Sequence, residues 1–130
     1  MKLKYSKNLE WLLPYLEVGL GMIPEGKKVT RLQTWQLKQR AGKGVQAAIF
    51  TNDYKTYRIY LHSMYHPRGE AKAQRFSKID ILGLLAHELA HTLDLMHSPE
   101  HKMLEGKILR TFMIKLKKEG YENEETELAS

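Results

Sequence analysis

The pentapeptide at residues 87–91, His-Glu-Leu-Ala-His, is the part of this sequence with the clearest chemical potential. On a helix, its four-residue spacing puts the imidazoles of His87 and His91 on one face, one turn apart. That separation suits two ligands of a single zinc ion. Glu88 is rotated by about 100° from His87, so its longer side chain can reach a water on the metal without replacing it. The pattern predicts two imidazole ligands, with Glu88 as the general base that takes a proton from that water.

His97 is the first candidate for the third protein ligand that a zinc hydrolase requires. It follows His91 by six residues, so on an unbroken helix it would face away from His91. It can bind the same ion only if the helix ends between the two. Pro99 disfavours helical backbone at the residue before it, and Asp94 tolerates a left-handed turn. Both residues favour such a break, and the sequence therefore favours His97.

His101 and Glu105 are alternative third ligands. They lie four residues apart on the next predicted helix, and therefore on one face of it. Either side chain could reach the metal if the two helices pack closely. A glutamate beside two histidines is a known ligand set for catalytic zinc. Both residues stay open as alternatives to His97.

The composition restricts which side chains can hold a metal. The chain has 130 residues, of which 42% are hydrophobic and 28% charged, and it contains six histidines and no cysteine. These proportions are typical of a globular domain. The lack of cysteine excludes disulfides, thiolate nucleophiles and every cysteine-based zinc site. We therefore expect one Zn²⁺ ion held by histidine and carboxylate side chains.

Apolar periodicity and turn residues predict the elements that must position this motif. The predicted elements are a helix over 7–20, a strand over 29–36, a hairpin of strands 45–50 and 54–61, and a polar loop over 62–76. Ser77 or Asp80 caps the motif helix, whose apolar periodicity continues to about residue 96. Ser98 and Pro99 begin a further helix, which ends near residue 118, before Gly120.

These elements predict an α+β fold. We expect a small, mostly antiparallel sheet packed on the N-terminal helix and the metal-binding helix, followed by a C-terminal helix. A chain of this length has no room for two full hydrophobic cores, so residues 1–120 should form a single domain. Residues 121–130 form an acidic tail that we expect to be disordered.

Residues 87–100, HELAHTLDLMHSPE, resemble the His-Glu-x-x-His-x5-His pattern of the small zinc metallopeptidases called SprT-like, WLM and YgjP-like. The third histidine has this spacing in the YgjP-like and WLM forms, and the Ser-Pro-Glu that follows also resembles the YgjP-like form. The resemblance extends over about residues 45–116. It implies a zincin-like metallopeptidase domain with one zinc ion. The implied site residues are the ligands His87, His91 and His97 and the catalytic base Glu88.

The sequence also departs from related patterns. These families usually have an aromatic residue four places after the third histidine, where this chain has His101. That departure affects the assignment of the third ligand. Metzincins share the histidine spacing but have a glycine at the position of Asp94. A metzincin is therefore not expected.

The resemblance implies hydrolysis of peptide bonds in a protein or peptide substrate. In zincins the substrate commonly lies along an edge strand beside the metal by β-augmentation, and residues 57–61 are the candidate strand. One alternative is a metal-dependent endoribonuclease resembling YbeY. That family shares the histidine spacing but lacks the glutamate, so Glu88 favours peptide hydrolysis. The other alternative is a non-catalytic binding module that zinc stabilises.

The positive charge of the chain is unevenly distributed. The net charge is +6, but residues 1–80 hold 15 Lys and Arg against 6 Asp and Glu, whereas residues 81–130 hold 6 against 9. A nucleic-acid partner should therefore contact the first 80 residues. We see no signal peptide and no stretch of transmembrane length, and expect a cytoplasmic protein without a membrane partner. The sequence leaves the oligomeric state open.

Overall fold

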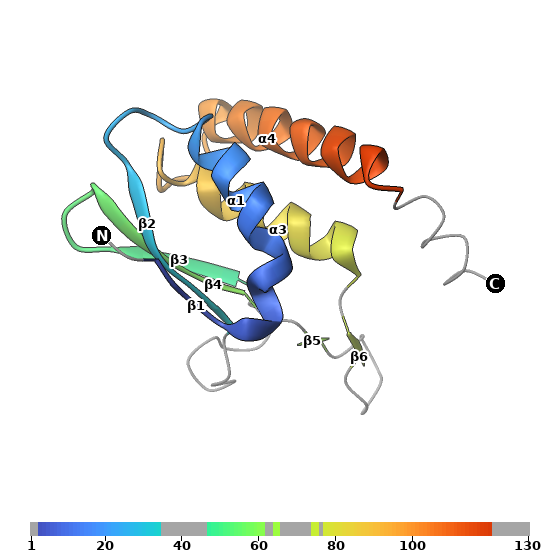
Figure 1. The fold of residues 1–130 in the computed structure, drawn as a ribbon. Coiled ribbons are helices and arrows are strands. Elements are labelled where there is room, and N and C mark those ends of the chain that lie inside the picture. Colours follow the sequence, from blue (N-terminus) through green and yellow to red (C-terminus); the bar gives the residue numbers. More distant parts are fainter. Residues whose placement is uncertain (1–2, 35–46, 62–63, 66–73, 76, 121–130) are drawn as a thin grey trace.

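The fold consists of a small sheet with helices on one side of it (Figure 1). The computed structural model describes residues 3–34, 47–61, 64–65, 74–75 and 77–120. The predicted acidic tail, residues 121–130, lies outside the described residues. No helix in the described part of the chain is long and apolar enough to cross a membrane.

The N-terminal segment forms a strand, a helical stretch and a second strand. Strand β1 is Lys4–Tyr5, the 3₁₀ helix η1 is Lys7–Leu12, helix α1 is Leu13–Leu20 and strand β2 is Lys28–Thr34. The helix predicted over residues 7–20 is thus confirmed in position, but its first half is 3₁₀. Pro14 explains the change, because it has no N–H for the α-type bond to the carbonyl of Glu10.

Strands β3 (Ala47–Thr51) and β4 (Thr56–Leu61) form the predicted hairpin. Asp53 closes its turn, since its Oδ1 accepts hydrogen bonds from the backbone N–H groups of Lys55 and Thr56 at 2.9 and 2.8 Å. The predicted turn at residues 51–53 is therefore confirmed.

The sheet is mixed rather than mostly antiparallel, so that part of the fold prediction was wrong. Its strand order is β1-β2-β4-β3. The β1–β2 and β2–β4 pairs are parallel, and only the β3–β4 hairpin is antiparallel. Parallel neighbours need a crossover connection, and η1 and α1 provide it between β1 and β2. The two residues of β1 gave no strand signal in the sequence, so this crossover was missed.

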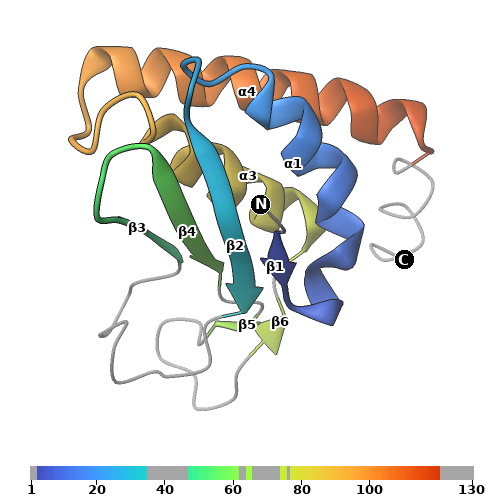
Figure 2. The same ribbon diagram turned by 60° about the vertical axis from the view of Figure 1, so that its left-hand side comes forward.

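Strand β4 is central, and it was wrongly predicted to be the edge strand beside the metal. It pairs with β2 on one side and β3 on the other, which leaves β3 at the edge (Figure 2). The inward side chains of β4, Tyr57, Ile59 and Leu61, are no more than 1% exposed. The strand with the most buried apolar side chains therefore lies between two others, where both of its backbone edges are also paired.

Two further helices complete the described fold. Helix α3 (Lys78–Ala90) begins with the predicted cap: the Ser77 side chain accepts from the Asp80 N–H, and the Asp80 carboxylate accepts from the Ser77 N–H. Helix α4 (Pro99–Lys118) has Ser98 as N-cap, as predicted. Within the predicted loop over 62–76, β5 (Met64–Tyr65) pairs with β6 (Gln74–Arg75), and the rest lies outside the described residues.

The hydrophobic core lies between the sheet and the helices, and between α1, α3 and α4. Its fully buried side chains come from every layer: Leu9, Leu12, Leu32, Tyr57, Ile59, Leu61, Leu82, Leu85, Leu89, Ile108 and Phe112. Helix α3 contacts the sheet on one side and α4 on the other. The core therefore fixes the position of α3, the helix that carries the histidine motif.

Gly19 allows α1 to approach α3 and α4 closely. A Cβ at this position would lie 2.5 Å from Leu89 Cδ1 and 3.3 Å from Phe112 Cζ. Both side chains are fully buried, so neither can move without disturbing the core. We expect Gly19→Ala to lower the free energy of unfolding by about 1–3 kcal/mol in urea denaturation.

Gly106→Ala in α4 is the matched control for that substitution. Gly106 is exposed, and no described residue lies within 4 Å of the added Cβ. Alanine should therefore raise the free energy of unfolding by about 0.5–1 kcal/mol, through its better helix propensity. A Gly19→Ala protein as stable as Gly106→Ala would contradict the close packing of α1.

Candidate metal centre

The motif helix ends before His97, as the third-ligand prediction required, and it ends earlier than the apolar periodicity to about residue 96 predicted. Helix α3 ends at Ala90, and His91 is its C-cap. Asp94 then orders the turn, without the positive φ that its residue type tolerates. Instead its Oδ1 accepts from the Met96 N–H at 2.9 Å. Hydrogen bonds from the Ser98 side chain and the Met96 backbone hold the pKa of Asp94 below its usual range.

Three imidazole nitrogens converge at the end of this helix. His87 Nε2 lies 3.1 Å from His97 Nε2 and 3.2 Å from His91 Nε2. Ligand nitrogens about 2.0–2.1 Å from a tetrahedral zinc ion are separated by about 3.4 Å. Both distances from His87 Nε2 are therefore close to the separation of two nitrogen ligands on one ion.

The other ring nitrogens of two of these histidines have partners that fix the ring orientation. His87 Nδ1 lies 2.9 Å from Glu105 Oε1, and His91 Nδ1 lies 3.0 Å from the carbonyl oxygen of Asp94. Both partners are acceptors, so Nδ1 donates and the lone pair of each ring is on Nε2. Two lone pairs that face each other at 3.2 Å repel unless a cation or proton lies between them. These residues therefore fit a metal ion, with the outer-shell contacts that metal-binding histidines usually have.

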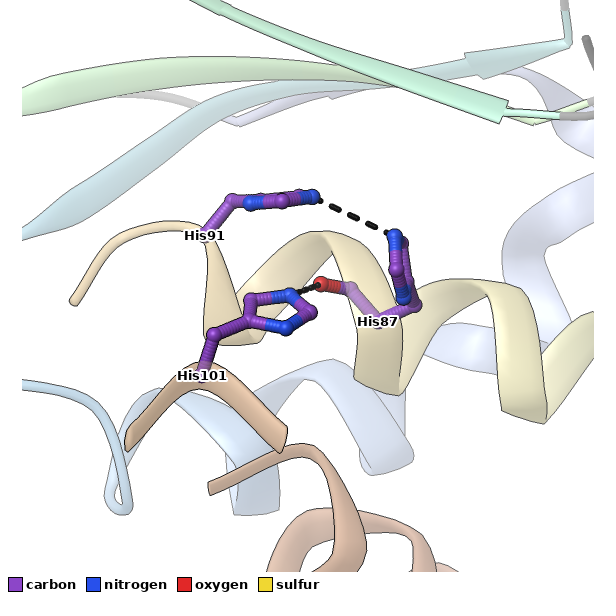
Figure 3. Close-up of side chains that lie close together, drawn as sticks. All are labelled: His87, His91 and His101. Carbon is purple, nitrogen blue, oxygen red and sulfur yellow. Dashed lines mark hydrogen bonds between the residues drawn. The ribbon is translucent and has the colours of Figure 1, made fainter. Parts of the chain in front are cut away.

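His101 contacts the motif helix from α4. It is completely buried, and its Nε2 donates to the carbonyl oxygen of His87 at 3.0 Å (Figure 3). That carbonyl belongs to the last turn of α3, where the chain leaves carbonyls without helical partners. His101 Nδ1 has no hydrogen-bond partner among the described residues. The nearest carboxylate oxygen, Glu105 Oε1, lies 3.8 Å away.

His101 also lies close enough to the motif to offer a different ligand set. One ring nitrogen each of His87, His91 and His101 lie within 4.8 Å of one another. His101 would have to give up its bond to the His87 carbonyl, or bind through Nδ1, to take part. Glu105 contacts His87 Nδ1 and not the point where the Nε2 atoms meet. The structure thus brings the predicted site residues together. The Nε2 atoms of His87, His91 and His97 face one another, whereas His101 and Glu105 contact His87 from α4.

Glu88 is the buried carboxylate of the site. It is 4% exposed, and its Oε2 has no hydrogen-bond partner among the described residues. Burial raises the pKa of Glu88 to about 7, the positive charge of a protonated His87 opposes the rise, and the negative charge of Glu105 adds to it. Burial likewise lowers the pKa of His91. A buried carboxylate without a partner, beside a group of imidazoles, is typical of a functional site.

These side chains line a cleft with a volume of about 640 Å³. Its walls come from α3, from the segment between α3 and α4, from α4 and from the edge strand β3. The lining residues are Ala47, Ile79, Asp80, Gly83, Leu84, His87, Glu88, His91, His97 and Glu105. The cleft therefore joins the histidines to an apolar stretch of α3 and to the start of β3.

The burial of Glu88 predicts a pH-dependent stability of the metal-free protein. Its folded-state pKa, about 7, lies above the ordinary value of 4.5. The stability that comes from the neutral form is therefore fully present below pH 4.5 and is lost as the pH rises to about 7. Glu88→Gln mimics the neutral form. Without metal, it should match the wild type at pH 4.5 and exceed its free energy of unfolding at pH 8 by about 3 kcal/mol.

Urea denaturation at both pH values in the presence of a chelator measures this difference. Glu17→Gln, at an exposed position in α1, is the control and should show no such pH dependence. A Glu88→Gln protein whose advantage is the same at pH 4.5 and pH 8 would show that the carboxyl is not desolvated.

The sequence did not indicate two roles in this site. The sequence offers His101 and Glu105 as alternative ligands, whereas in the structure His101 contacts the motif helix and Glu105 contacts its first histidine. Their four-residue spacing showed that they share one face of α4, and this was the only available signal. The contact of His91 with the Asp94 carbonyl had no signal, because a backbone atom accepts the hydrogen bond.

Comparisons with known proteins agree on the fold. No protein-family model and no curated protein matches the sequence. Two solved structures of Wss1 from Saccharomyces cerevisiae are similar to this chain. One, of a mutant, is 15% identical with a TM-score of 0.51, and the match covers 92% of this chain and 94% of that chain. The other is 16% identical with a TM-score of 0.52, and the match covers 92% of each. The chain therefore shares the fold of Wss1 over nearly its whole length.

Proposed function

We propose that this chain is a zinc-dependent metallopeptidase with a zincin-like domain. The observation that carries the proposal is the convergence of three Nε2 atoms beside a buried glutamate that has no hydrogen-bond partner in the described part of the chain. The fold shared with Wss1 agrees with the resemblance of residues 87–100 to the WLM and YgjP-like peptidases. At this low identity the comparison supports the fold, and the activity rests on the site.

In this proposal His87, His91 and His97 hold the ion through Nε2. The contacts of Glu105 and of the Asp94 carbonyl support this, because they leave the Nε2 lone pairs of His87 and His91 free to bind. Neutral imidazole is the form that binds metal, and the lowered pKa of His91 favours it.

Glu88 is the catalytic base. A zinc ion held by the histidines would lower the pKa of a water molecule and polarise a peptide carbonyl. Glu88 takes a proton from the attacking water and returns it to the departing amine nitrogen. The peptide C–N bond breaks, one water is consumed, and the carboxylate returns to its starting state. The proximity of a cation would favour the ionised form that this role needs.

The edge strand β3 is the proposed docking site for the substrate backbone. In the described part of the chain no strand pairs with its outer edge. Ala47, at the start of β3, lines the same cleft as Glu88 and the histidines. An extended peptide that adds to β3 would therefore pass the metal ligands. Ile79, Gly83 and Leu84 continue the cleft along α3, with space for an apolar side chain.

Hydrolysis assays with the zinc-loaded chain test the proposal. We expect cleavage of casein, loss of cleavage with 1,10-phenanthroline, and recovery when zinc is restored; 1,7-phenanthroline, which does not chelate, is the control. Labelled RNA should remain intact. Cleavage of RNA but not of casein would favour the endoribonuclease. A zinc-loaded chain that cleaves neither substrate, but unfolds when zinc is removed, would favour the non-catalytic module.

A further inference from the structure

The cleft continues past the histidines along α3, which lies beside strand β3 (Figures 1 and 2). Gly83, His87 and His91 follow one another at four-residue spacing, so they form one stripe of the helix, and all three line the cleft. Four helical residues rise by about 6 Å, whereas an extended chain advances by about 3.3 Å per residue. A substrate whose scissile bond lies at the converging Nε2 atoms would therefore have a side chain beside Gly83, within about two residues of that bond.

Gly83 leaves open space at this point of the cleft. No described residue lies within 4 Å of a Cβ built on Gly83, whereas a Cβ on Gly19 would lie 2.5 Å from Leu89 Cδ1. Gly83 does not have a positive φ either. Glycine inside a helix is less stable than alanine. Since neither packing nor backbone conformation requires glycine here, its effect is to leave room beside the first histidine of the motif.

The walls around this space are mostly apolar. Ile79 lies one turn before Gly83, Leu84 follows it, and Ala47 comes from the start of β3. Ile79, Leu84 and Ala47 are half-buried and pack against the hydrophobic core, so the fold holds them in place without a ligand. A preformed apolar space with a few polar groups beside it is the usual form of a binding pocket.

Glu88 gives independent evidence that this part of the cleft receives a ligand. It lies one turn after Leu84 and lines the same cleft. Its side chain is 4% exposed, and its Oε2 has no hydrogen-bond partner among the described residues. A buried polar atom without a partner is uncommon in a folded protein. The apolar space therefore adjoins a group that is itself ready to contact a bound molecule.

Asp80 is the charged residue nearest to this space along α3, and its charge is partly compensated within the helix. It lines the cleft one turn before Leu84. Its carboxylate accepts a hydrogen bond from the Ser77 N–H. It also lies in the first turn of α3, where the helix dipole stabilises negative charge. Its attraction for a cationic side chain should therefore be weak, and the apolar walls should decide what binds.

We propose that the space beside Gly83 is a specificity pocket for a large apolar side chain of the substrate, such as Leu, Met or Phe, within about two residues of the scissile bond. The proposal rests on the proposed peptidase function and specifies its substrate class. The apolar walls favour such a side chain over Lys or Arg, and the open space favours it over Ala or Ser. Gly83 determines the specificity because any larger residue at this position would fill the pocket.

Cleavage-site profiling of a synthetic peptide library by mass spectrometry tests the pocket in the zinc-loaded chain. At one position near the cut, the wild type should prefer Leu, Met or Phe to Ala by roughly tenfold or more in kcat/KM. In Gly83→Leu the new side chain occupies the pocket, so this ratio should fall to about one while cleavage beside Ala continues. Gly83→Ala should give an intermediate ratio.

Gly106→Leu is the matched control. It makes the same change at a helical glycine that also has no described residue within 4 Å of its Cβ but does not line the cleft. This variant should keep the wild-type ratio, and circular dichroism should show that both leucine variants are folded. The proposal is overturned if the wild type prefers Lys or Arg at this position, or has no preference near the cut. It is also overturned if Gly83→Leu keeps the wild-type ratio, or if Gly106→Leu loses it.

A binding measurement distinguishes failure of the pocket from failure of the peptidase. Zinc-loaded Glu88→Gln should bind a labelled Gly- and Ser-rich peptide with one central Leu roughly tenfold more tightly than the same peptide with Ala, by fluorescence anisotropy. Glu88→Gln/Gly83→Leu should bind the two peptides alike. If the wild type cleaves no peptide but Glu88→Gln shows this difference, the peptidase is refuted and the pocket stands. Cleavage without a difference in binding refutes the pocket alone.

Discussion

Glu88→Gln should abolish peptide hydrolysis and leave zinc binding intact. The amide has nearly the same shape as the carboxyl, but it cannot accept the proton of the attacking water. Loss of a general base typically lowers kcat by about 10²–10⁴-fold. Glu88 does not lie among the three converging Nε2 atoms, so we expect one zinc per chain in the variant. Casein cleavage and zinc content by mass spectrometry measure the two effects.

Two variants make this result specific. Glu17→Gln carries the same chemical change at an exposed position in α1 and should retain full activity. Glu88→Asp keeps a carboxylate but withdraws it by one methylene, so it should retain more activity than Glu88→Gln. Zinc-loaded Glu88→Gln that cleaves casein at the wild-type rate would refute Glu88 as the base. A variant that loses its zinc would instead place Glu88 among the ligands.

The local elements of the fold could be predicted from the sequence because their signals are local. Ser77 and Ser98 cap helices at the predicted residues, since a cap depends on side chains within one turn. The hairpin of β3 and β4 was identified by the turn residues around Asp53. Each of these predictions required only contacts between neighbours in the chain.

The strand order could not be predicted because it depends on contacts between distant segments. A two-residue strand such as Lys4–Tyr5 has no periodicity to detect. The central place of β4 agrees with the burial of its inward side chains. The sequence favoured residues 57–61 as the edge strand, whereas their burial places them in the centre. The edge strand beside the cleft, and therefore the proposed docking site, is β3.

The site itself could be predicted only in part. His87, Glu88 and His91 share a spacing that helix geometry fixes, and the break after His91 followed from the residues around Pro99. The place of His101 depends on how closely α4 packs on α3. In the sequence, His101 occupies the position where the SprT-like, WLM and YgjP-like peptidases usually have an aromatic residue. Its Nε2 donates to the His87 carbonyl in the last turn of the motif helix. The packing of α4 on α3 determines this contact, and the spacing of residues along the sequence does not reveal it.

The third ligand can be identified by separating zinc affinity from folding stability. His97 is exposed and its ring contributes little to the core. His97→Ala should therefore leave the metal-free free energy of unfolding almost unchanged. Its zinc affinity should fall by more than the roughly 10–100-fold that loss of an outer-shell partner causes. Glu105→Gln removes the carboxylate beside His87 Nδ1 and should fall within that range. Competition with a chromophoric chelator measures both affinities.

His101→Ala should show the opposite balance. The substitution leaves the carbonyl of His87 without its donor and opens a cavity beside α3. It should lower the metal-free free energy of unfolding by about 1–3 kcal/mol, while zinc affinity falls no further than in Glu105→Gln. If His101 were the third ligand, it would be His101→Ala that lost more than 100-fold in affinity, and His97→Ala would keep its zinc. Only a ring that binds the ion directly should cost more than 100-fold in zinc affinity when it is removed. His97→Ala and His101→Ala can therefore both show that loss only if both rings bind the ion.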